Sequence, residues 1–218
     1  MLEDTLTYRK QAAWALMLLF PVLSVLYLFG PDNTPFLGTV SNFLIKQNNT
    51  SIIGGCFLGF YVFIAFCYKG YDWKDKVVMK ISGSSCIGTI IFETTRSLWI
   101  NIPGGIGVFN LPKKVSMVLH IICGGIFYIS LIVITAYNFT RKDSNPTEKK
   151  LKRNKVYISC AIFQTLFFIG QFICMAFSVK GNYSFGVKLS TSLVNALFLI
   201  TAGFAWFVKG GGIKKLND

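Results

Sequence analysis

The sequence predicts an all-α integral membrane protein, a bundle of six transmembrane helices that forms one domain over residues 1–218. Three observations predict it: the composition, the spacing of the apolar stretches and the placement of the basic residues. The chain is 53% hydrophobic and 14% charged, with a mean hydropathy of +0.54. Because soluble domains are typically about 25% charged, so few charges indicate a chain embedded mostly in hydrocarbon.

Six apolar stretches approach the length of about 20 residues that a helix needs to cross a bilayer. They cover residues 11–30, 51–68, 76–95, 115–138, 156–178 and 184–208. The first contains Pro21, which a membrane helix tolerates as a kink, and it lacks a signal-peptide cleavage pattern, so we expect it to be retained. The second carries Gly55 and Gly59, whose spacing would allow close approach of a neighbouring helix.

The basic residues predict the orientation of the bundle. The net charge is +13, and fifteen lysines and arginines fall at the two chain ends and in the connections around residues 69–76 and 141–155, against six in the alternate connections. The positive-inside rule then places both termini in the cytoplasm of a multi-pass cell-membrane protein. Basic residues distributed in this way argue against nucleic-acid binding. We expect residues 141–155 to form a loop and the basic tail after residue 208 to be a flexible segment that touches anionic lipid.

Polar side chains recur every three or four residues in three of the predicted helices, which places them on one helix face. They are Ser82, Ser85, Thr89, Glu93 and Arg96 in the 76–95 helix, Cys160, Gln164, Gln171, Cys174 and Ser178 in the 156–178 helix, and Lys188, Thr191, Ser192 and Asn195 in the 184–208 helix. We therefore expect these helices to turn polar faces inward. The 11–30 helix lacks such a stripe and is expected at the periphery.

Residues from four helices are predicted to share one depth near the outer surface. The 76–95 helix runs outward and carries its acid near its end, and His120, the only histidine, lies one or two turns into the next helix from that side. A charge at this depth is costly unless it is paired or hydrated. The sequence thus predicts an outward-facing pocket for a lipid headgroup or a small polar or anionic ligand. Its candidate residues are Glu93, Arg96, His120, Gln171, Lys188 and Asn195.

Other interpretations of the same residues stay open. In a purely structural one, Glu93 pairs with Arg96 or Lys188 and His120 bonds a main-chain carbonyl. In a second, the polar faces line a small transporter or channel. In a third, Glu93 and His120 are the catalytic pair of an intramembrane lipid hydrolase or transferase. The nucleophile would then be Ser82, Ser85 or Ser116, although no nucleophile-elbow pattern surrounds them.

We expect no metal and no other cofactor. One histidine cannot ligate a haem from both sides, and a zinc hydrolase usually needs three protein ligands. The glycine runs lack the strand–turn–helix context of a nucleotide-binding fingerprint. All six cysteines lie in predicted helices, where they are expected as small buried hydrophobes. The partners expected are membrane lipids, a small polar or anionic ligand and, in an oligomer, further copies of this chain.

The centre of the chain resembles a known superfamily. Its residues read Ile81-Ser-Gly-x-x-x-x-Gly88, then Phe92, and after a loop His120-x-x-x-Gly124-Gly-x-Phe127-Tyr128. This arrangement is similar to the six-helix membrane superfamily that includes the DRAM-type proteins and bacterial families of unknown function. The resemblance covers residues 76–138 in detail and implies a role in lipid organisation, trafficking or lipid modification. The chain departs from the pattern in the Glu-Thr-Thr that follows Phe92.

Overall fold

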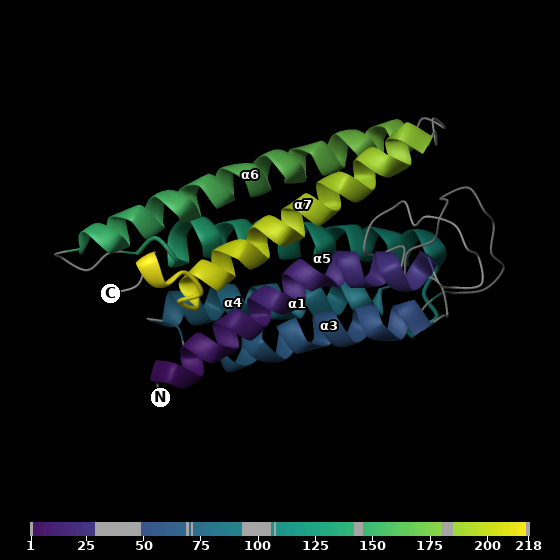
Figure 1. Cartoon of the computed structure of the whole chain (residues 1–218). Coiled ribbons are helices and arrows are strands. Elements are labelled where there is room, and N and C mark those ends of the chain that lie inside the picture. Colours follow the sequence, from purple (N-terminus) through teal and green to yellow (C-terminus); the bar gives the residue numbers. More distant parts are fainter. Residues whose placement is uncertain are drawn as a thin grey trace.

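A computed structural model describes residues 2–28, 49–68, 70, 72–92, 106, 108–141, 146–179 and 185–216. In these residues all regular structure is helical, and the one β-type contact is an isolated bridge between Ile106 and Leu111. The described part contains six α-helices (Figure 1). They are α1 (Leu2–Leu28), α3 (Asn49–Cys67), α4 (Trp73–Ile91), α5 (Lys113–Val133), α6 (Glu148–Val179) and α7 (Phe185–Lys209). A π-helical turn, η1 (Ile134–Asn138), continues α5, and a 3-10 turn, η2 (Lys214–Leu216), follows α7.

The helices run alternately in opposite directions along one long axis. Figure 1 shows α1 beginning and α7 ending at the same end of the molecule, which we call the terminal end. At the opposite end α4 and α6 finish and α5 and α7 begin. The six predicted helices are confirmed as helices to within several residues at most boundaries. The prediction of a loop over residues 141–155 was wrong in its second half, because α6 already begins at Glu148.

Three of the described helices are long and apolar enough to cross a membrane. They are Lys113–Asn138, which joins α5 to η1, then Glu148–Phe177 and Phe185–Lys209, and a shorter apolar helix covers Ile53–Cys67. The side chains of α6 are largely exposed, including Phe163, Leu166 and Phe172. Exposed apolar surface on such a scale is what lipid or another membrane helix covers. The chain therefore has the helices of a membrane protein.

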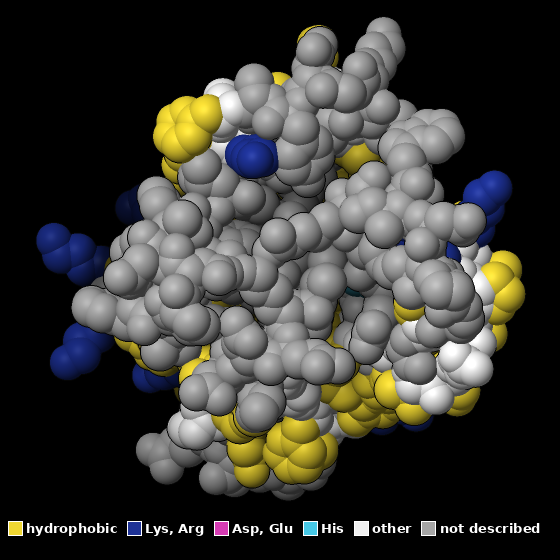
Figure 2. Space-filling view, turned by 90° about the vertical axis from the view of Figure 1, so that its right-hand side faces the viewer, with side chains coloured by type: hydrophobic (Ala, Val, Ile, Leu, Met, Phe, Trp, Pro, Cys, Tyr) yellow, Lys and Arg dark blue, Asp and Glu magenta, His cyan; other side chains and the backbone are white. Residues whose placement is uncertain are grey.

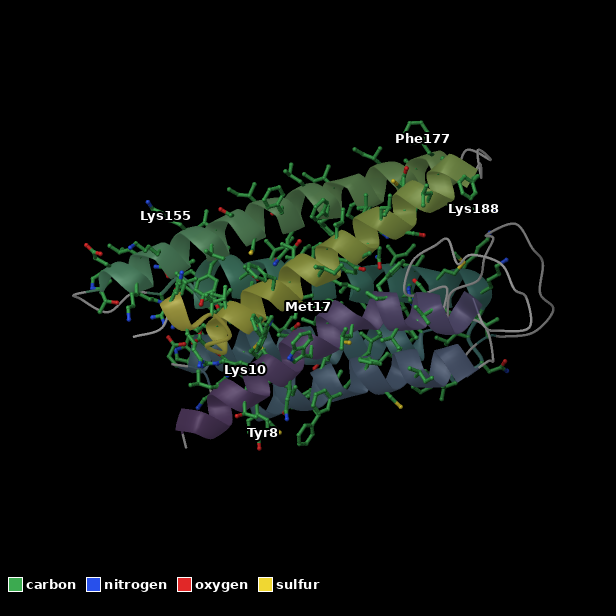
Figure 3. The ribbon with its side chains drawn as sticks, viewed as in Figure 1. Tyr8, Lys10, Met17, Lys155, Phe177 and Lys188 are labelled. Carbon is green, nitrogen blue, oxygen red and sulfur yellow. The ribbon has the colours of Figure 1, made fainter. Side chains whose placement is uncertain are left out.

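The prediction that the first helix is peripheral was wrong. Ala12, Ala13 and Leu16 of α1 are at most 1% exposed, and α1 packs extensively against α7 and also against α3. Small residues make this approach possible, since a Cβ added at Gly203 of α7 would lie 2.7 Å from the main-chain oxygen of Ala13. Figure 3 labels Met17 where α1 and α7 cross. The first helix lacks a polar stripe because its buried contacts are apolar.

The close approach expected at Gly55 and Gly59 was also wrong. A Cβ added at either position would meet nothing within 4 Å. Close packing occurs instead at Gly88 of α4, where an added Cβ would collide with the side chain of Cys123 on α5. Gly203 therefore permits the close packing of α1 on α7, and Gly88 permits that of α4 on α5. No other part of the described structure packs where a side chain at Gly55 or Gly59 would lie.

A group of buried aromatic side chains fills the core near the terminal end. The indole of Trp206 lies edge-on to Phe139, with ring centroids 5.2 Å apart, and also meets Tyr61 and Tyr68. The π-helical turn brings Phe139 to this position directly after α5, and Phe139 is fully buried. This group joins α3, α7 and the end of η1.

The basic tail is folded rather than flexible over residues 210–216. The main-chain N–H of Gly210 donates to Trp206 over 2.8 Å, that of Gly212 donates to Phe207 over 2.9 Å, and η2 follows. Gly210 lies directly against α1, since an added Cβ would be 2.9 Å from Cγ of Lys10. The tail is thus packed against the bundle, with Gly210 on α1 and η2 on α6, and this corrects the expectation of a free segment.

Candidate functional site

His120 is buried between α5 and the end of α4. Its Nδ1 donates a hydrogen bond of 2.8 Å to the main-chain carbonyl of Phe92, and the residue is 8% exposed. Phe92 is the residue that ends α4, so the bond joins the two helices. This bond to a main-chain carbonyl is the contact that the purely structural interpretation of the sequence predicts for His120. Glu93 and Arg96 lie outside the described residues, and their place beside His120 stays a prediction.

Asn195 of α7 forms a polar contact that joins three helices. Its Nδ2 donates to the hydroxyl of Tyr128 on α5 over 2.6 Å, and Asn195 is 1% exposed. The ring of Tyr128 stacks on Phe168 of α6, with centroids 5.9 Å apart, and contacts Phe198 of α7. The sequence analysis considered Tyr128 only as part of the motif shared with the superfamily. In the structure, Tyr128 is the hydrogen-bond partner of Asn195, a predicted site residue.

Two glutamines of α6 point into the same interior. Gln164 is fully buried and its Nε2 donates to Oγ1 of Thr135 over 3.2 Å. The amide oxygen of Gln164 is buried without a hydrogen-bond partner, and so is that of Gln171. The two residues are seven apart, which places them on one helix face about 10 Å from each other along α6. An unpaired buried acceptor costs about 1–3 kcal/mol, so both oxygens are positions where a bound donor would be stabilised.

These residues define what we call the polar seam. Its members are Tyr128, Thr135, Gln164, Gln171 and Asn195, and they come from α5 with η1, from α6 and from α7. Helix α6 packs closely on α7 but only sparsely on α5. Figure 1 shows the α6–α7 pair diverging from α5 toward the opposite end. The seam is thus bordered by the closely packed α6–α7 pair on one side and by α5 on the other, with few contacts between α5 and α6.

Lys188 lies in the first turns of α7 at the opposite end. It is half-buried, and Figure 3 places it near Phe177 of α6, far from Lys10 and Lys155 at the terminal end. Figure 2 views this end and shows hydrophobic side chains along the described rim with Lys and Arg side chains at the margins. Lys188 and the start of α5 thus lie at the same end of the molecule. Their shared depth in a membrane stays a prediction.

Sequence reasoning missed an ion-paired group at the terminal end. The guanidinium of Arg141, which follows η1, lies 2.7 Å from a carboxylate oxygen of Asp72 and 3.5 Å from one of Asp75. Asp72 also caps α4 by accepting the main-chain N–H of Asp75 over 3.0 Å. That N–H, and then Arg141, hold the pKa of Asp72 below its ordinary value. The same carboxylate, and next the hydroxyl of Tyr137, raise the pKa of Arg141.

Four further basic side chains lie at this end of the molecule, and we call them the basic cluster. They are Arg9 of α1, Lys150 and Arg153 of α6, and Lys209 of α7. Lys209 is 8% exposed, with its Nζ 5.5 Å from the ring centroid of Phe139, and Lys150 donates to the carbonyl of Phe139 over 3.1 Å. Arg9 lies over the ring of Tyr68 at 5.5 Å and donates to its hydroxyl over 3.4 Å.

One sequence signal could have located this end of the site. Asp72 and Asp75 stand three residues apart at the start of an apolar stretch, which is the spacing of a helix N-cap and its third residue. The expected helix began at residue 76 and left both acids in a loop, whereas α4 begins at Trp73 and fully buries Asp75. Lys209 gave no such signal, because only the fold brings it onto Phe139.

The chain matches no protein-family model, no curated protein and no solved structure. Its class is therefore defined by the architecture of the described residues alone. These residues form a helical protein in which three helices are long and apolar enough to cross a membrane, with a polar seam between α5, α6 and α7 and a basic cluster at the terminal end.

Proposed function

We propose that this chain is a multi-pass protein of the cell membrane that binds a lipid in the polar seam. The observation that carries the proposal is the pair of buried amide oxygens on Gln164 and Gln171, which have no partner and lie where α6 packs sparsely on α5. A buried acceptor without a partner is destabilising. A ligand that donates to both oxygens would remove this cost, so the polar seam is built for a ligand with hydroxyl, amine or amide donors.

The surroundings of the polar seam favour a lipid over a water-soluble ligand. The outward side of α6 is apolar and exposed, with Ile162, Phe163 and Ile169 each at least half exposed. A ligand that reaches the seam past α6 would come from the bilayer, where a lipid supplies both a polar headgroup and chains that cover apolar surface. An apolar groove of ≈ 370 Å³, separate from the polar seam, lies between α1 and α3 and is lined by Trp14, Phe60 and neighbouring side chains.

The predicted outer residues take part in the same proposal. Lys188 lies at the end toward which α6 and α7 diverge from α5. His120 is the eighth residue of α5, which begins at that end. With Glu93 and Arg96 added from the sequence, this end would offer basic donors to a phosphate, positioned by one carboxylate. In this arrangement the headgroup lies near the start of α7, and its hydrogen-bond donors are closer to Gln171 than to Gln164.

Transport is the second candidate, and one observation favours it. Polar side chains on the inner face of α6 run from Asn154 through Gln164 to Gln171, a distance of about 25 Å along the helix, and the amide oxygen of each is buried without a partner. A stripe of this length would span most of the hydrocarbon core. A transported solute would use the whole stripe, whereas a bound lipid needs only its outer half.

The test is mass spectrometry of lipids retained by the purified chain. We expect one lipid class with donor groups to be enriched in the wild-type protein, and Gln164→Leu and Gln171→Leu each to lower its retention. The loss of one hydrogen bond worth about 1 kcal/mol corresponds to a decrease of about fivefold. Thr165→Val is the matched control, because Thr165 is exposed on the same helix and bonds only the carbonyl of Ala161.

The outcomes separate the candidate functions. Lipid of bulk composition in every variant would contradict the lipid proposal. Uptake of a polar solute into liposomes that Asn154→Leu and Gln164→Leu both abolish would establish transport instead. New lipid species that accumulate with wild type and are lost in His120→Ala would show that the site is an enzyme.

A further inference from the structure

We infer that a groove at the start of α6 binds a phospholipid whose headgroup joins a phosphate to a primary ammonium group, as in phosphatidylethanolamine. The groove has a volume of ≈ 1040 Å³ and lies at the terminal end, where Figure 3 labels Lys155. Lys188 and the headgroup position proposed for the polar seam lie at the opposite end, so this second site does not depend on the proposed function. The residues that line the groove include Glu148, Leu151, Lys152, Asn154, Lys155 and Ile158.

The groove lies at the depth of lipid headgroups in a membrane that α6 crosses. Helix α6 is long and apolar enough to do so, and its residues 156–177 contain no charged side chain. This uncharged stretch is about 33 Å long, close to the roughly 30 Å of the hydrocarbon core. Lys155 directly precedes the stretch, so the polar part of the groove faces the headgroup region.

An exposed apolar stripe of α6 begins in the groove. Ile158 lines the groove, and Ile162, Ile169 and Ile173 follow at helical spacing, which places all four on one face of α6. Their side chains are between 46% and 56% exposed. The acyl chains of a lipid bound in the groove would cover this stripe, whereas a small water-soluble anion would leave it bare. The groove therefore suits a lipid.

The charged side chains of the groove follow the order of groups in such a lipid. Lys155, Lys152 and Glu148 succeed one another from the apolar stripe toward the start of α6. Acyl chains, phosphate and ammonium group follow in the same order, so the two lysines would donate to the phosphate and Glu148 would accept from the ammonium group. Glu148 and Lys152 lie 3.9 Å apart, with side chains 90% and 67% exposed. So exposed a pair contributes little, and its rearrangement around a headgroup costs little.

Asn154 distinguishes a primary ammonium group from the quaternary group of phosphatidylcholine. The residue is 7% exposed and lines the groove, and its Oδ1 is buried without a hydrogen-bond partner. Its Nδ2 donates to the main-chain carbonyl of Thr140 over 2.8 Å, which fixes the orientation of the amide. A buried acceptor in this state favours a ligand that carries N–H donors. A primary ammonium group has three such donors, and a choline group has none.

Photo-crosslinking at one position of the full-length chain tests this site. A photoreactive amino acid replaces Ile158, the protein in detergent receives limiting, equal amounts of phosphatidylethanolamine and phosphatidylcholine, and mass spectrometry identifies the cross-linked lipid. We expect phosphatidylethanolamine to be enriched about fivefold or more, the ratio that one hydrogen bond worth about 1 kcal/mol produces. The same probe at Ile173, on the same stripe about 22 Å away, reports lipid that lies outside the groove.

Variants of the headgroup contacts make the test specific. Glu148→Gln removes an exposed carboxylate, and we expect it to lower the enrichment at Ile158 about fivefold while the ratio at Ile173 stays unchanged. Glu148→Asp keeps the charge and should keep most of the enrichment. Asn154→Leu removes the acceptor and should act like Glu148→Gln. Because Asn154 also bonds the main chain, its result is read beside that of the exposed acid.

The lysines make contacts that both phospholipids share. Lys152→Gln with Lys155→Gln should therefore lower the cross-linking yield of both lipids at Ile158 and leave their ratio unchanged. The charge-matched control is Lys214→Gln with Lys215→Gln, at exposed positions of η2. We expect this control to keep the yield within about twofold of wild type, because screened surface charges contribute little.

Each outcome decides the inference. Enrichment at Ile158 that Glu148→Gln removes and Glu148→Asp keeps supports it. Equal cross-linking of the two lipids in the wild type would overturn it, as would a preference that Glu148→Gln leaves unchanged. Stronger cross-linking of phosphatidylglycerol, which carries hydroxyl donors but no ammonium group, would also overturn it. Gln164→Leu and Gln171→Leu should leave the result at Ile158 unchanged, so failure of the lipid proposal for the polar seam is read separately.

Discussion

Asp72 shows how one side chain at the terminal end couples local geometry to pH. Its carboxylate caps α4 through the N–H of Asp75 and pairs with Arg141, and both contacts hold its pKa below the ordinary value. A group whose pKa is lowered by folding stabilises the folded state above its unfolded pKa of about 3.9. That stabilisation is lost as the pH falls through the lower, folded pKa.

We therefore expect Asp72→Asn to lower Tm at neutral pH and to flatten its decline in the acid range. The measurement is thermal unfolding in detergent between about pH 3 and pH 7, the range in which carboxylates titrate. Glu148→Gln is the control, because Glu148 is an exposed acid that forms a long, solvent-exposed ion pair of 3.9 Å with Lys152. An Asp72→Asn profile parallel to that of the wild type would contradict the assignment.

Single residues also show how far the sequence reached the candidate site. Periodicity correctly predicted that Ser85, Gln164 and Asn195 face inward. A polar side chain on a membrane helix is costly to expose to lipid, so it faces the interior of the bundle. It did not predict their partners, since the contact of Asn195 with Tyr128 joins residues 67 positions apart. Partners at such separations depend on helix rotation and crossing, which a one-dimensional pattern does not contain.

At the scale of the helices, a glycine permits the close contact between α1 and α7. An alanine at Gly203 would place its Cβ 2.7 Å from the main-chain oxygen of Ala13 and 3.0 Å from the main-chain nitrogen of Met17. Because these are backbone atoms, α1 and α7 must separate to admit it. We expect Gly203→Ala to destabilise the chain by about 1–3 kcal/mol, the usual cost of overpacking, measured as denaturant or thermal unfolding in detergent.

The matched control is Gly59→Ala on α3. This glycine is also helical, but an added Cβ meets nothing within 4 Å. Alanine has a helix propensity about 1 kcal/mol better than glycine, so this variant should be neutral or slightly more stable. If the two variants behaved alike, close approach of α1 and α7 would not be the cause.

The same contacts explain why the sequence predicted the helices well and their neighbours poorly. Length and hydropathy are enough to locate a helix, and all six predicted segments are helical. In a membrane, however, an apolar side chain is equally acceptable against lipid and against another helix. The sequence therefore wrongly predicted apolar α1 to be peripheral, and the spacing of Gly55 and Gly59 wrongly predicted a close helix contact. The close contact lies at Gly203, where α1 and α7 cross, and the sequence pattern does not mark this glycine.

At the scale of the whole molecule, the arrangement of the helices predicts how many of them cross the membrane. Three of the described helices meet the requirements of length and hydropathy, and the other three described helices lie beside them. Helix α4 packs closely against α5 with opposite direction, and its 19 residues span about 28 Å, close to the thickness of the hydrocarbon core. Its first lysines, Lys74 and Lys76, stand at the terminal end, where they can reach the headgroups.

This arrangement predicts the side of the membrane for each connection. If all six helices cross, Gly70, Pro146 and Leu216 lie on one side and Asn110 lies on the other. If only α5, α6 and α7 cross, Gly70 moves to the side of Asn110, while Pro146 and Leu216 stay together. Gly70 therefore distinguishes the two topologies, and the other three positions serve as internal references.

We expect the six-span result. Short epitope tags inserted at these four positions would be tested for antibody or protease access in intact cells and after permeabilisation. Accessibility only after permeabilisation at Gly70, Pro146 and Leu216, with access in intact cells at Asn110, would also place the terminal end in the cytoplasm, as the positive-inside rule requires. A tag at Gly70 on the side of Asn110 would leave α4 outside the hydrocarbon. Lys74 and Lys76 at the start of α4 would then not mark the cytoplasmic end of a membrane-spanning helix.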